Sequence, residues 1–300
     1  MKHEALSSMK RAFTAFFCTF LLVASAVLAD DPQKAKALFN EGLEAEKKGD
    51  LVTAVTAYEA AVGQDPNYLD PQMNLGAIYF KQGKYENALK LYKSVSEKDP
   101  KNIDALTNLG KVQSALKQFA EAEVSFNKAL SQKPDDKDLQ KELSKLYFRK
   151  NDYSNVIKTT QQIHSSGGGD DETWYMLGRA YSKTDKSADA IAALNKSVQL
   201  DPKQYGALFE LGQIYLSQEK YGDAATSFRA AMKANPKKHL AAFNYAIAKE
   251  SMAPEDTKTN LVAWEEFVRL FKNDPLAKTN IATAEAHIKE MKDALAAKGN

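Results

Sequence analysis

The sequence predicts an all-α solenoid of about seven helix-turn-helix repeats followed by a C-terminal capping helix. The first observation is a fixed period: the interval from Pro66 to Pro100 equals the intervals from Pro100 to Pro134 and from Pro202 to Pro236. The second is that small and large apolar residues recur at fixed places within that period. A fixed period of this length is typical of solenoids, in which each unit buries its apolar face only by stacking on its neighbours.

At this period the repeat region, placed at 30–275, divides into seven units. The expected units are 35–68, 69–102, 103–136, 137–170, 171–204, 205–238 and 239–277. The last is longer than the others and is expected to carry an insertion at 251–260 between its helices. Residues 278–300 follow as the capping helix, because Ile281, Ala284, Ile288, Met291 and Leu295 form an apolar stripe at helical spacing.

Small residues in two columns predict that the two helices of each unit approach closely, and large residues in a third column fill the space that remains. The first small column is Gly42, Gly76, Gly110, Ser144, Gly178, Gly212 and Ala246. The second small column is Ala54, Ala88, Ala122, Val156, Ala190, Ala224 and Ala263. The large column is Tyr58, Tyr92, Phe126, Thr160, Leu194, Phe228 and Phe267.

A tight turn separates the helices of a unit, and a proline ends most units. In the sixth unit the apolar spacing breaks at Glu219-Lys220. The residue before a proline is disfavoured in a helix, so the second helices are expected to end at Asp65, Asp99, Asp201 and Asn235. The fourth unit departs most, with Ser144 and Thr160 in the packing columns and a loose inter-repeat loop expected at 165–169.

Two segments carry a recognisable signature nearly whole. Trp174, Leu177, Gly178 and Tyr181 have the spacing W-x2-L-G-x2-Y, and Ala224, Phe228, Ala231 and Pro236 have the spacing A-x3-F-x2-A followed by proline. This pattern resembles the tetratricopeptide repeat. The resemblance implies a right-handed superhelix whose first helices line a concave groove that binds extended peptides or helices.

Residues 1–29 have the features of a secretory signal peptide. Lys10-Arg11 precedes an apolar run at 12–28, and Val27-Leu28-Ala29 places small residues at the spacing of a cleavage site. We therefore expect residues 1–29 to be cleaved and the protein to be exported, to the periplasm. The alternatives are an uncleaved N-terminal membrane anchor, since the run is at the short edge of what spans a bilayer, or full secretion.

Cleavage would leave a chain without cysteine or net charge. Cys18 is the only cysteine, and residues 1–29 hold three of the 41 basic residues and one of the 39 acidic residues, which leaves 38 of each. A neutral chain with interspersed charges has no basic stripe for nucleic acid. We therefore expect no nucleic-acid partner, and membrane contact only through an uncleaved N-terminus.

No motif for catalysis, a cofactor or a metal is present. His164, His239 and His287 lie in different units without a partner at metal-ligand spacing, and each is expected to be a surface or groove residue. The glycines at 167–169 lack the ending of a phosphate-binding loop. The sequence therefore predicts a protein that is not an enzyme.

Function is then expected on the outward stripe of the first helices. One column of this stripe carries Asn40, Asn74, Asn108 and, in the last unit, Asn244. An asparagine amide both donates and accepts, so the first three form a candidate ladder for the backbone of an extended peptide. This resembles the asparagine ladder in the repeats of O-linked N-acetylglucosamine transferase. Alternatively, Asn-Leu-Gly is a common sequence of this repeat and the amides bond to their own turns.

Further along the stripe the side chains become basic and then aromatic. Lys111, Lys141, Lys145 and Arg179 are expected to make the middle of the groove basic. Tyr175, Phe209 and Phe243 occupy one column in three consecutive units, where they either bury a partner's apolar side chains or pack between adjacent first helices.

The sequence thus predicts an exported scaffold or adaptor that binds a protein or peptide in its groove and acts in envelope assembly or secretion. One alternative is a membrane-anchored component of a secretion, pilus or outer-membrane assembly machine. Another is a self-assembling structural scaffold, which would make self-association its main interaction.

Overall fold

The computed structural model describes residues 31–298, and these residues form fifteen α-helices, one short 3-10 helix and no strand. The expectation of an all-helical repeat array with a C-terminal helix is confirmed. The expected signal peptide lies outside the described residues.

The α-helices follow one another as seven pairs and a final single helix. Their bounds are α2 Pro32–Lys47, α3 Leu51–Gln64, α4 Leu69–Lys81, α5 Tyr85–Lys98, α6 Ile103–Ala115, α7 Phe119–Gln132, α8 Lys137–Arg149, α9 Tyr153–Ser165, α10 Asp171–Lys183, α11 Ser187–Leu200, α12 Tyr205–Ser217, α13 Tyr221–Ala234, α14 His239–Met252, α15 Thr257–Phe271 and α16 Lys278–Lys298. The 3-10 helix η1, Pro275–Ala277, precedes α16.

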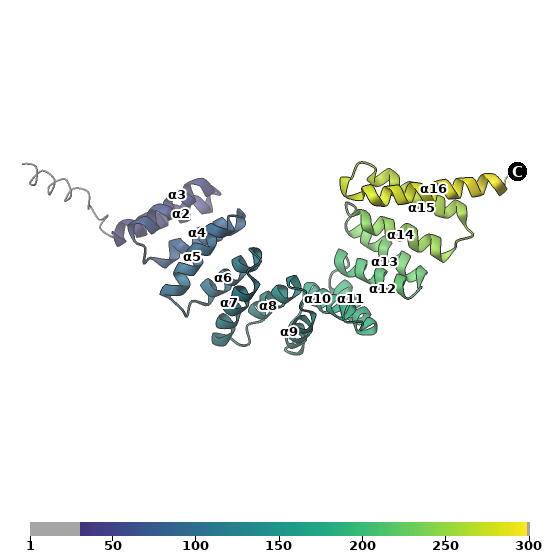
Figure 1. The fold of residues 1–300 in the computed structure, drawn as a ribbon. Helices are drawn as coiled ribbons and strands as arrows, with labels where there is room; N and C mark the ends of the chain where they lie inside the picture. The colour runs from purple at the N-terminus through teal and green to yellow at the C-terminus, as the bar shows by residue number, and fades with distance from the viewer. Residues whose placement is uncertain (1–30, 299–300) are drawn as a thin grey trace, which may run out of the picture. The chain divides into compact units, whose positions relative to one another are not determined.

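The described chain divides into two compact parts, which we call the N-terminal block (31–132) and the C-terminal block (133–298). The N-terminal block holds the pairs from α2 to α7, and the C-terminal block holds the pairs from α8 to α15 together with α16. Within each block the second helix of a pair also packs on the first helix of the next, as the order of the ribbons shows (Figure 1).

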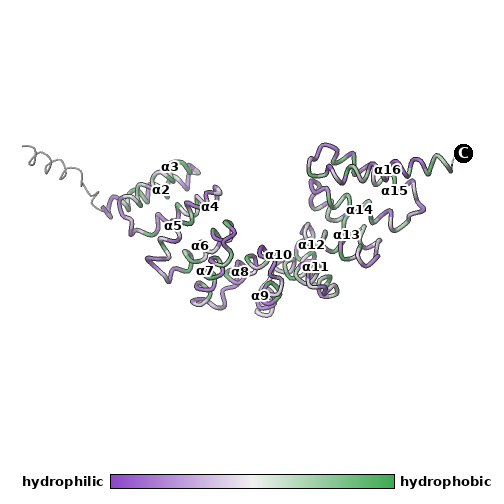
Figure 2. The backbone as a smooth tube through the Cα atoms, viewed as in Figure 1, coloured by the Kyte–Doolittle hydropathy of each residue, from purple (hydrophilic) through white to green (hydrophobic). Residues whose placement is uncertain are grey.

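Five of the seven pairs are held together where a glycine of the first helix meets a large side chain of the second. A Cβ added to Gly42, Gly76 or Gly110 would lie 2.4–2.8 Å from the ring of Tyr58, Tyr92 or Phe126. The same holds for Gly178 against Leu194 and Gly212 against Phe228, at 2.6 Å in both cases. These large side chains are almost completely buried, so the two columns predicted from the period are the centre of the core. Hydrophobic residues accordingly recur along every helix (Figure 2).

The turn inside each of the first six pairs depends on one residue in the left-handed conformation. Gly49 and Gly83 occupy this place with φ of 78° and 73°, and the later pairs use Lys117, Asn151, Asp185 and Glu219 with φ between 57° and 61°. The following amide bonds back to the carbonyl five residues earlier, for example Lys84 N to Tyr79 O at 2.9 Å. This is the Schellman ending of a helix, and it explains why the chain reverses within a few residues.

In the fourth pair both packing columns hold a polar residue, and both residues are hydrogen-bonded. The first-helix residue is larger than the glycine of most other pairs, and the second-helix residue is smaller than their aromatic residues. Ser144 and Thr160 are both fully buried. Ser144 Oγ bonds to Gln140 O at 2.9 Å and to Thr159 Oγ1 at 2.7 Å, and Thr160 Oγ1 donates to Val156 O at 2.7 Å. These hydrogen bonds offset the free-energy cost of burying the hydroxyl groups.

The inter-repeat loop expected at 165–169 is present, since residues 166–170 lie outside the helices, and hydrogen bonds hold it at both ends. Gly167 has φ of 71°, its amide donates to His164 O, and the amide of Gly168 donates to Ile163 O, so α9 ends in a Schellman motif. Lys137 Nζ binds Ser166 O at 2.9 Å, and Asp170 begins α10 with a capping box. Gly167 and Gly169 adopt the positive φ angles that this segment needs. Lys137 on one side and Asp170 on the other hold the segment by hydrogen bonds.

The seventh pair differs from the expected alignment. Relative to the start of the first helix in each pair, α15 begins two positions later than α5 does, so the insertion adds two residues at the turn. Asn260 and Trp264, both buried, then occupy the columns assigned from the sequence to Ala263 and Phe267. Asn260 Nδ2 donates to Ala253 O at 2.8 Å, and this bond offsets the burial of an amide in a column of small apolar residues.

The final helix covers the last pair. Ile281, Ala284, Ile288 and Met291 of α16 pack in one cluster with Trp264 and Phe267 of α15. Glu250 of α14 joins both neighbours, since it accepts a hydrogen bond from Trp264 Nε1 at 2.8 Å and lies 3.2 Å from His287 Nδ1 of α16. The polar back of α16 is exposed.

Replacement of Gly76 by leucine tests the packing column directly. We expect Gly76→Leu to lower the free energy of unfolding by about 3 kcal/mol, because the side chain must displace the buried ring of Tyr92. Gly63→Leu is the control, since nothing lies within 4 Å of a Cβ at this exposed helical position. Equal denaturant midpoints for the two variants would show that the close approach does not limit stability.

Candidate binding surfaces

In the N-terminal block the asparagine column is present but unevenly exposed. Asn40 of α2 is exposed, whereas Asn74 of α4 and Asn108 of α6 are half-buried. Asn74 Nδ2 donates to Tyr58 Oη at 3.3 Å, and this hydroxyl donates to Glu46 Oε2 at 2.9 Å. Burial raises the pKa of Tyr58 to about 12, so its hydroxyl stays protonated and this chain of bonds persists at neutral pH. Part of the amide capacity of Asn74 is thus already used within the array.

In the C-terminal block the same column is largely covered. Met176 and Glu210 are 2% and 7% exposed, and only Glu142 and Asn244 are half-buried. Because neighbouring first helices touch here, this column faces the adjacent helix rather than solvent. Fewer residues of the predicted outward stripe are therefore exposed to solvent in this block than expected.

The three aromatic residues pack within the C-terminal block, and all are half-buried. The ring of Tyr175 lies 5.8 Å from that of Phe148 in α8 and would lie 2.7 Å from a Cβ on Gly206 in α12. Tyr175 thus fills the space between adjacent first helices, one of the two roles left open by the sequence. Phe209 packs on Phe228, with ring centroids 5.6 Å apart.

Phe243 packs against the other helix of its own pair. Its ring lies 5.4 Å from the rings of both Trp264 and Phe267. Phe243 therefore contributes to the core of the last pair, and only the remaining exposed part of the ring is available to a partner.

The basic residues of the C-terminal block are paired with carboxylates of the next repeat. Lys141 Nζ contacts Asp170 and lies 2.9 Å from Glu172 Oε2, and Lys145 Nζ lies 3.1 Å from the same oxygen. Although burial alone would raise it, the hydrogen bonds from both lysines lower the pKa of Glu172. The stability that this group contributes is present above the ordinary carboxylate pKa and is lost as the pH falls through the lowered value. The expectation of a basic middle overlooked these acidic partners.

Arg179 is positioned by three groups. Its Nη1 donates to Tyr175 Oη at 3.0 Å, its Nε lies 3.4 Å from Glu210 Oε1, and its guanidinium lies 5.3 Å from the centre of the Phe148 ring. Glu210 is buried, so Arg179 is the cation that compensates its charge. In the N-terminal block, Lys111 of α6 is half-buried and also interacts with other groups.

All three histidines are half-buried, and His164 and His287 stack on tryptophan rings. His164 stacks on Trp174 with ring centroids 3.7 Å apart, and burial lowers its pKa. His287 stacks on Trp264 at 4.7 Å, and His239 Nδ1 lies 3.4 Å from Asp274 Oδ2.

The described part of the chain contains neither a candidate metal site nor a candidate membrane span. Residues 31–298 bring together no group of three or more potential metal ligands. They also form no helix with both the length and the apolarity needed to cross a bilayer.

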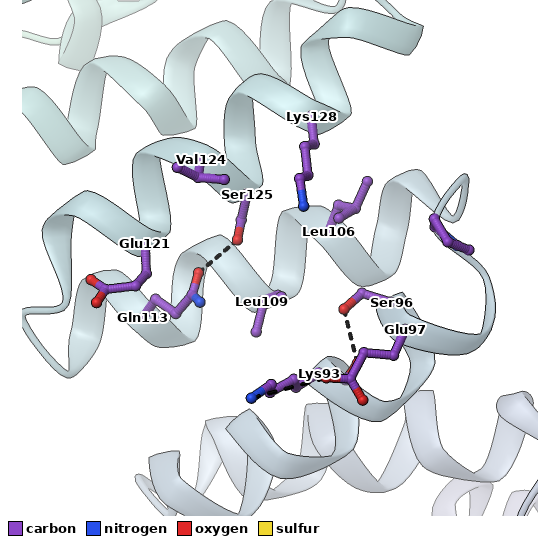
Figure 3. A pocket seen from close by; sticks show the side chains of 11 residues that line it. Lys93, Ser96, Glu97, Leu106, Leu109, Gln113, Glu121, Val124, Ser125 and Lys128 are labelled. Atoms are coloured by element: carbon purple, nitrogen blue, oxygen red, sulfur yellow. Dashed lines mark hydrogen bonds and ion pairs between the residues drawn. The ribbon is translucent and has the colours of Figure 1, made fainter.

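A cavity of about 340 Å³ opens in the N-terminal block between α5, α6 and α7 (Figure 3). Its floor is apolar and includes the buried side chains of Leu106 and Leu109 from α6. Polar side chains surround it, and in one contact Ser125 Oγ donates to Gln113 Oε1 at 2.7 Å. Leu106, Leu109 and Gln113 belong to the packing face of α6, so this cavity lies away from the outward stripe. Sequence analysis missed it.

The Arg179 and Glu210 pair generates a stability prediction. We expect Arg179→Met to lower the free energy of unfolding by about 3 kcal/mol, because a buried carboxylate is left without its cation. A second change, Glu210→Leu, is expected to restore most of the loss. Urea titrations of both variants test this, and additive losses in the double variant would contradict the pairing.

Comparison with protein families identifies the repeat. Models described as tetratricopeptide repeat match residues 79–146, 175–239 and 210–250, and one described as TPR repeat matches 47–83. Together they span 47–146 and 175–250, more than half of the chain. No curated protein sequence matches it.

Solved structures share the fold at low sequence identity. A tetratricopeptide repeat protein from Parabacteroides merdae is similar with a TM-score of 0.63 and 18% identity, over 84% of this chain and 99% of that one. The C-terminal part of a TPR repeat-containing protein from Cytophaga hutchinsonii gives 0.61 and 18%, also over 84% and 99%.

A third similar structure is larger. Cut9-Hcn1, the hetero-tetramer of the APC/C, gives a TM-score of 0.57 and 19% identity over 78% of this chain, which spans 45% of that one. The family matches and the packed helix pairs agree, and this chain belongs to the tetratricopeptide repeat family.

Proposed function

We propose that the protein is a non-enzymatic scaffold that binds a peptide or protein segment along the first helices of its N-terminal block. The observation that carries this proposal is the asparagine column, in which Asn40 is exposed and Asn74 and Asn108 are partly accessible on successive first helices. Tetratricopeptide repeats present such a surface without chemistry of their own.

The hydrogen-bonding capacity of the column suits a peptide backbone. Each amide has two donor hydrogens and a carbonyl oxygen, and the one hydrogen bond of Asn74 to Tyr58 uses a single donor. Residues Asn40, Asn74 and Asn108 recur at intervals of one period, so each repeat offers an equivalent group to a ligand lying across the helices. Asn244 offers a similar group in the last repeat.

The aromatic and basic residues of the C-terminal block have mainly structural roles. Tyr175, Phe209 and Phe243 keep their neighbouring helices in place and present the exposed part of each ring, while Lys145 and Arg179 act as paired charges. Lys111 is the basic residue closest in sequence to the asparagine column. A ligand of the C-terminal block would have to compete with existing ion pairs, which favours the N-terminal block as the binding site.

We further propose that the protein works outside the cytoplasm, in the cell envelope, in assembly or secretion. The support is the basic pair, apolar run and small-residue ending of residues 1–29. The distribution of the protein between periplasmic and membrane fractions, together with the N-terminal residue of the isolated protein, tests this part alone.

Binding is tested with immobilised residues 30–300, a captured envelope partner and titration of that partner against variants. We expect Asn40→Ala/Asn74→Ala/Asn108→Ala to weaken binding at least tenfold and to weaken it similarly for different ligands, because main-chain bonds do not read side chains. The control is Asn127→Ala, an exposed asparagine of α7 outside the column.

A triple variant that keeps its helical content and melting temperature but binds as tightly as wild type would exclude the asparagine column. Equal weakening by the triple variant and by Asn127→Ala would indicate a general loss of stability instead. Both results would contradict the proposed site.

A further inference from the structure

The cavity between α5, α6 and α7 lies where other repeats place a tyrosine. Tyr79, Tyr147, Tyr181 and Tyr215 occupy the third position after the small residue of their first helices. In the third repeat this position is Gln113, which lines the cavity. Tyr79 and Tyr147 are each only 7% exposed, and Tyr181 and Tyr215 are half-buried, so a tyrosine at this position is at least half-buried.

The structure also shows how a tyrosine is held at this position. Tyr79 Oη bonds to Glu59, and Gln161 Nε2 donates to Tyr181 Oη at 2.8 Å. In both cases the partner stands on the preceding second helix, at the same distance along the chain from the tyrosine. The equivalent of Gln113 in this pattern is Lys93 of α5, which lines the same cavity.

A second missing side chain enlarges the space. Ser96 stands in a column that elsewhere contains Val62, Val198 and Met232. Two periods further along the chain, the places of Ser96 and Leu106 hold His164 and Trp174, whose stacked rings fill the same region. The cavity therefore forms because Gln113 and Ser96 replace larger side chains at one interface between helices. Both residues lie within the N-terminal block.

We propose that this cavity is a socket for a tyrosine side chain presented by a partner polypeptide. The ring would lie on Leu106 and Leu109, and the hydroxyl would point to Lys93. Figure 3 shows the surrounding side chains, which come from α5, α6, α7 and the loop between α5 and α6.

The chemistry of the lining selects tyrosine over an aliphatic side chain. A phenol combines an apolar ring with a polar tip, and the socket combines an apolar floor with a polar rim. The ammonium groups of Lys93 and Lys128 are complementary to the phenolic oxygen. Lys93 is free to turn, because its pairing with Glu97 at 3.9 Å joins two exposed side chains and contributes little.

Val124 supports a docking role for the rim. It is 54% exposed, whereas the same column carries a polar residue in four other second helices, Thr56, Lys90, Lys158 and Thr226; α11 and α15 carry Ala192 and Val262 there. An exposed valine beside an apolar floor extends the contact area available to the segment that carries the tyrosine.

The socket is tested with p-cresol, which is the tyrosine side chain as a free molecule. We expect p-cresol to shift the methyl resonances of Leu106 and Leu109 in a saturable manner, with a dissociation constant on the order of 1 mM for so small a probe. Gln113→Tyr should abolish these shifts without lowering the melting temperature, because it restores the tyrosine of the other repeats. Gln118→Tyr, in the exposed turn after α6, is the matched control and should bind as wild type.

Three results would overturn the proposal: no saturable shift in wild type, an unchanged shift in Gln113→Tyr, or equally tight binding of N-acetyl-leucinamide. If Gln113→Tyr does not fold, Ser96→Met fills the cavity from α5 and must give the same loss. The triple asparagine variant should bind p-cresol as wild type, so failure of the socket and failure of the groove are distinguishable.

Discussion

The close approach of two helices at a glycine is the constraint on which the rest of this structure depends. With no side chain at Gly76 or Gly212, the ring of Tyr92 or Phe228 lies directly against the first-helix backbone. This contact sets the distance within each pair, and the second helix of the pair then becomes the surface on which the next first helix packs. The fourth pair shows the same constraint from the other side, because Ser144 is accompanied by the small residue Thr160.

Repetition of one contact also explains which surfaces remain for binding. Where a large residue fills the space between adjacent first helices, as Tyr175 does, the outward column of these helices is partly covered. Where a repeat lacks a large residue, as at Gln113 and Ser96, a cavity remains. Departures from the repeat thus locate candidate sites better than the consensus residues do, since the consensus residues serve the core.

The period of the sequence predicts most of the fold, but it predicts less about which residues are exposed or paired at the surface. Periodicity was sufficient for the helix pairs, the helix ends before proline and the packing of Gly212 on Phe228. It failed at α15, because a two-residue shift in the turn moved Trp264 into the large column. Periodicity also did not predict the ion pairs of the basic residues. Glu172 and Glu210 each belong to the repeat after that of their cationic partner, and comparison of equivalent positions does not show which residues of neighbouring repeats are in contact.

The compensation between the two packing columns is tested most directly by a double-mutant cycle in the fourth pair. Thr160→Phe should destabilise the protein because its ring meets the side chain of Ser144, and Ser144→Gly should destabilise it by removing two hydrogen bonds. Together they recreate the glycine and ring of the other repeats, so the account predicts a favourable coupling of at least about 1 kcal/mol in urea unfolding. Losses that add to within about 0.3 kcal/mol would contradict it.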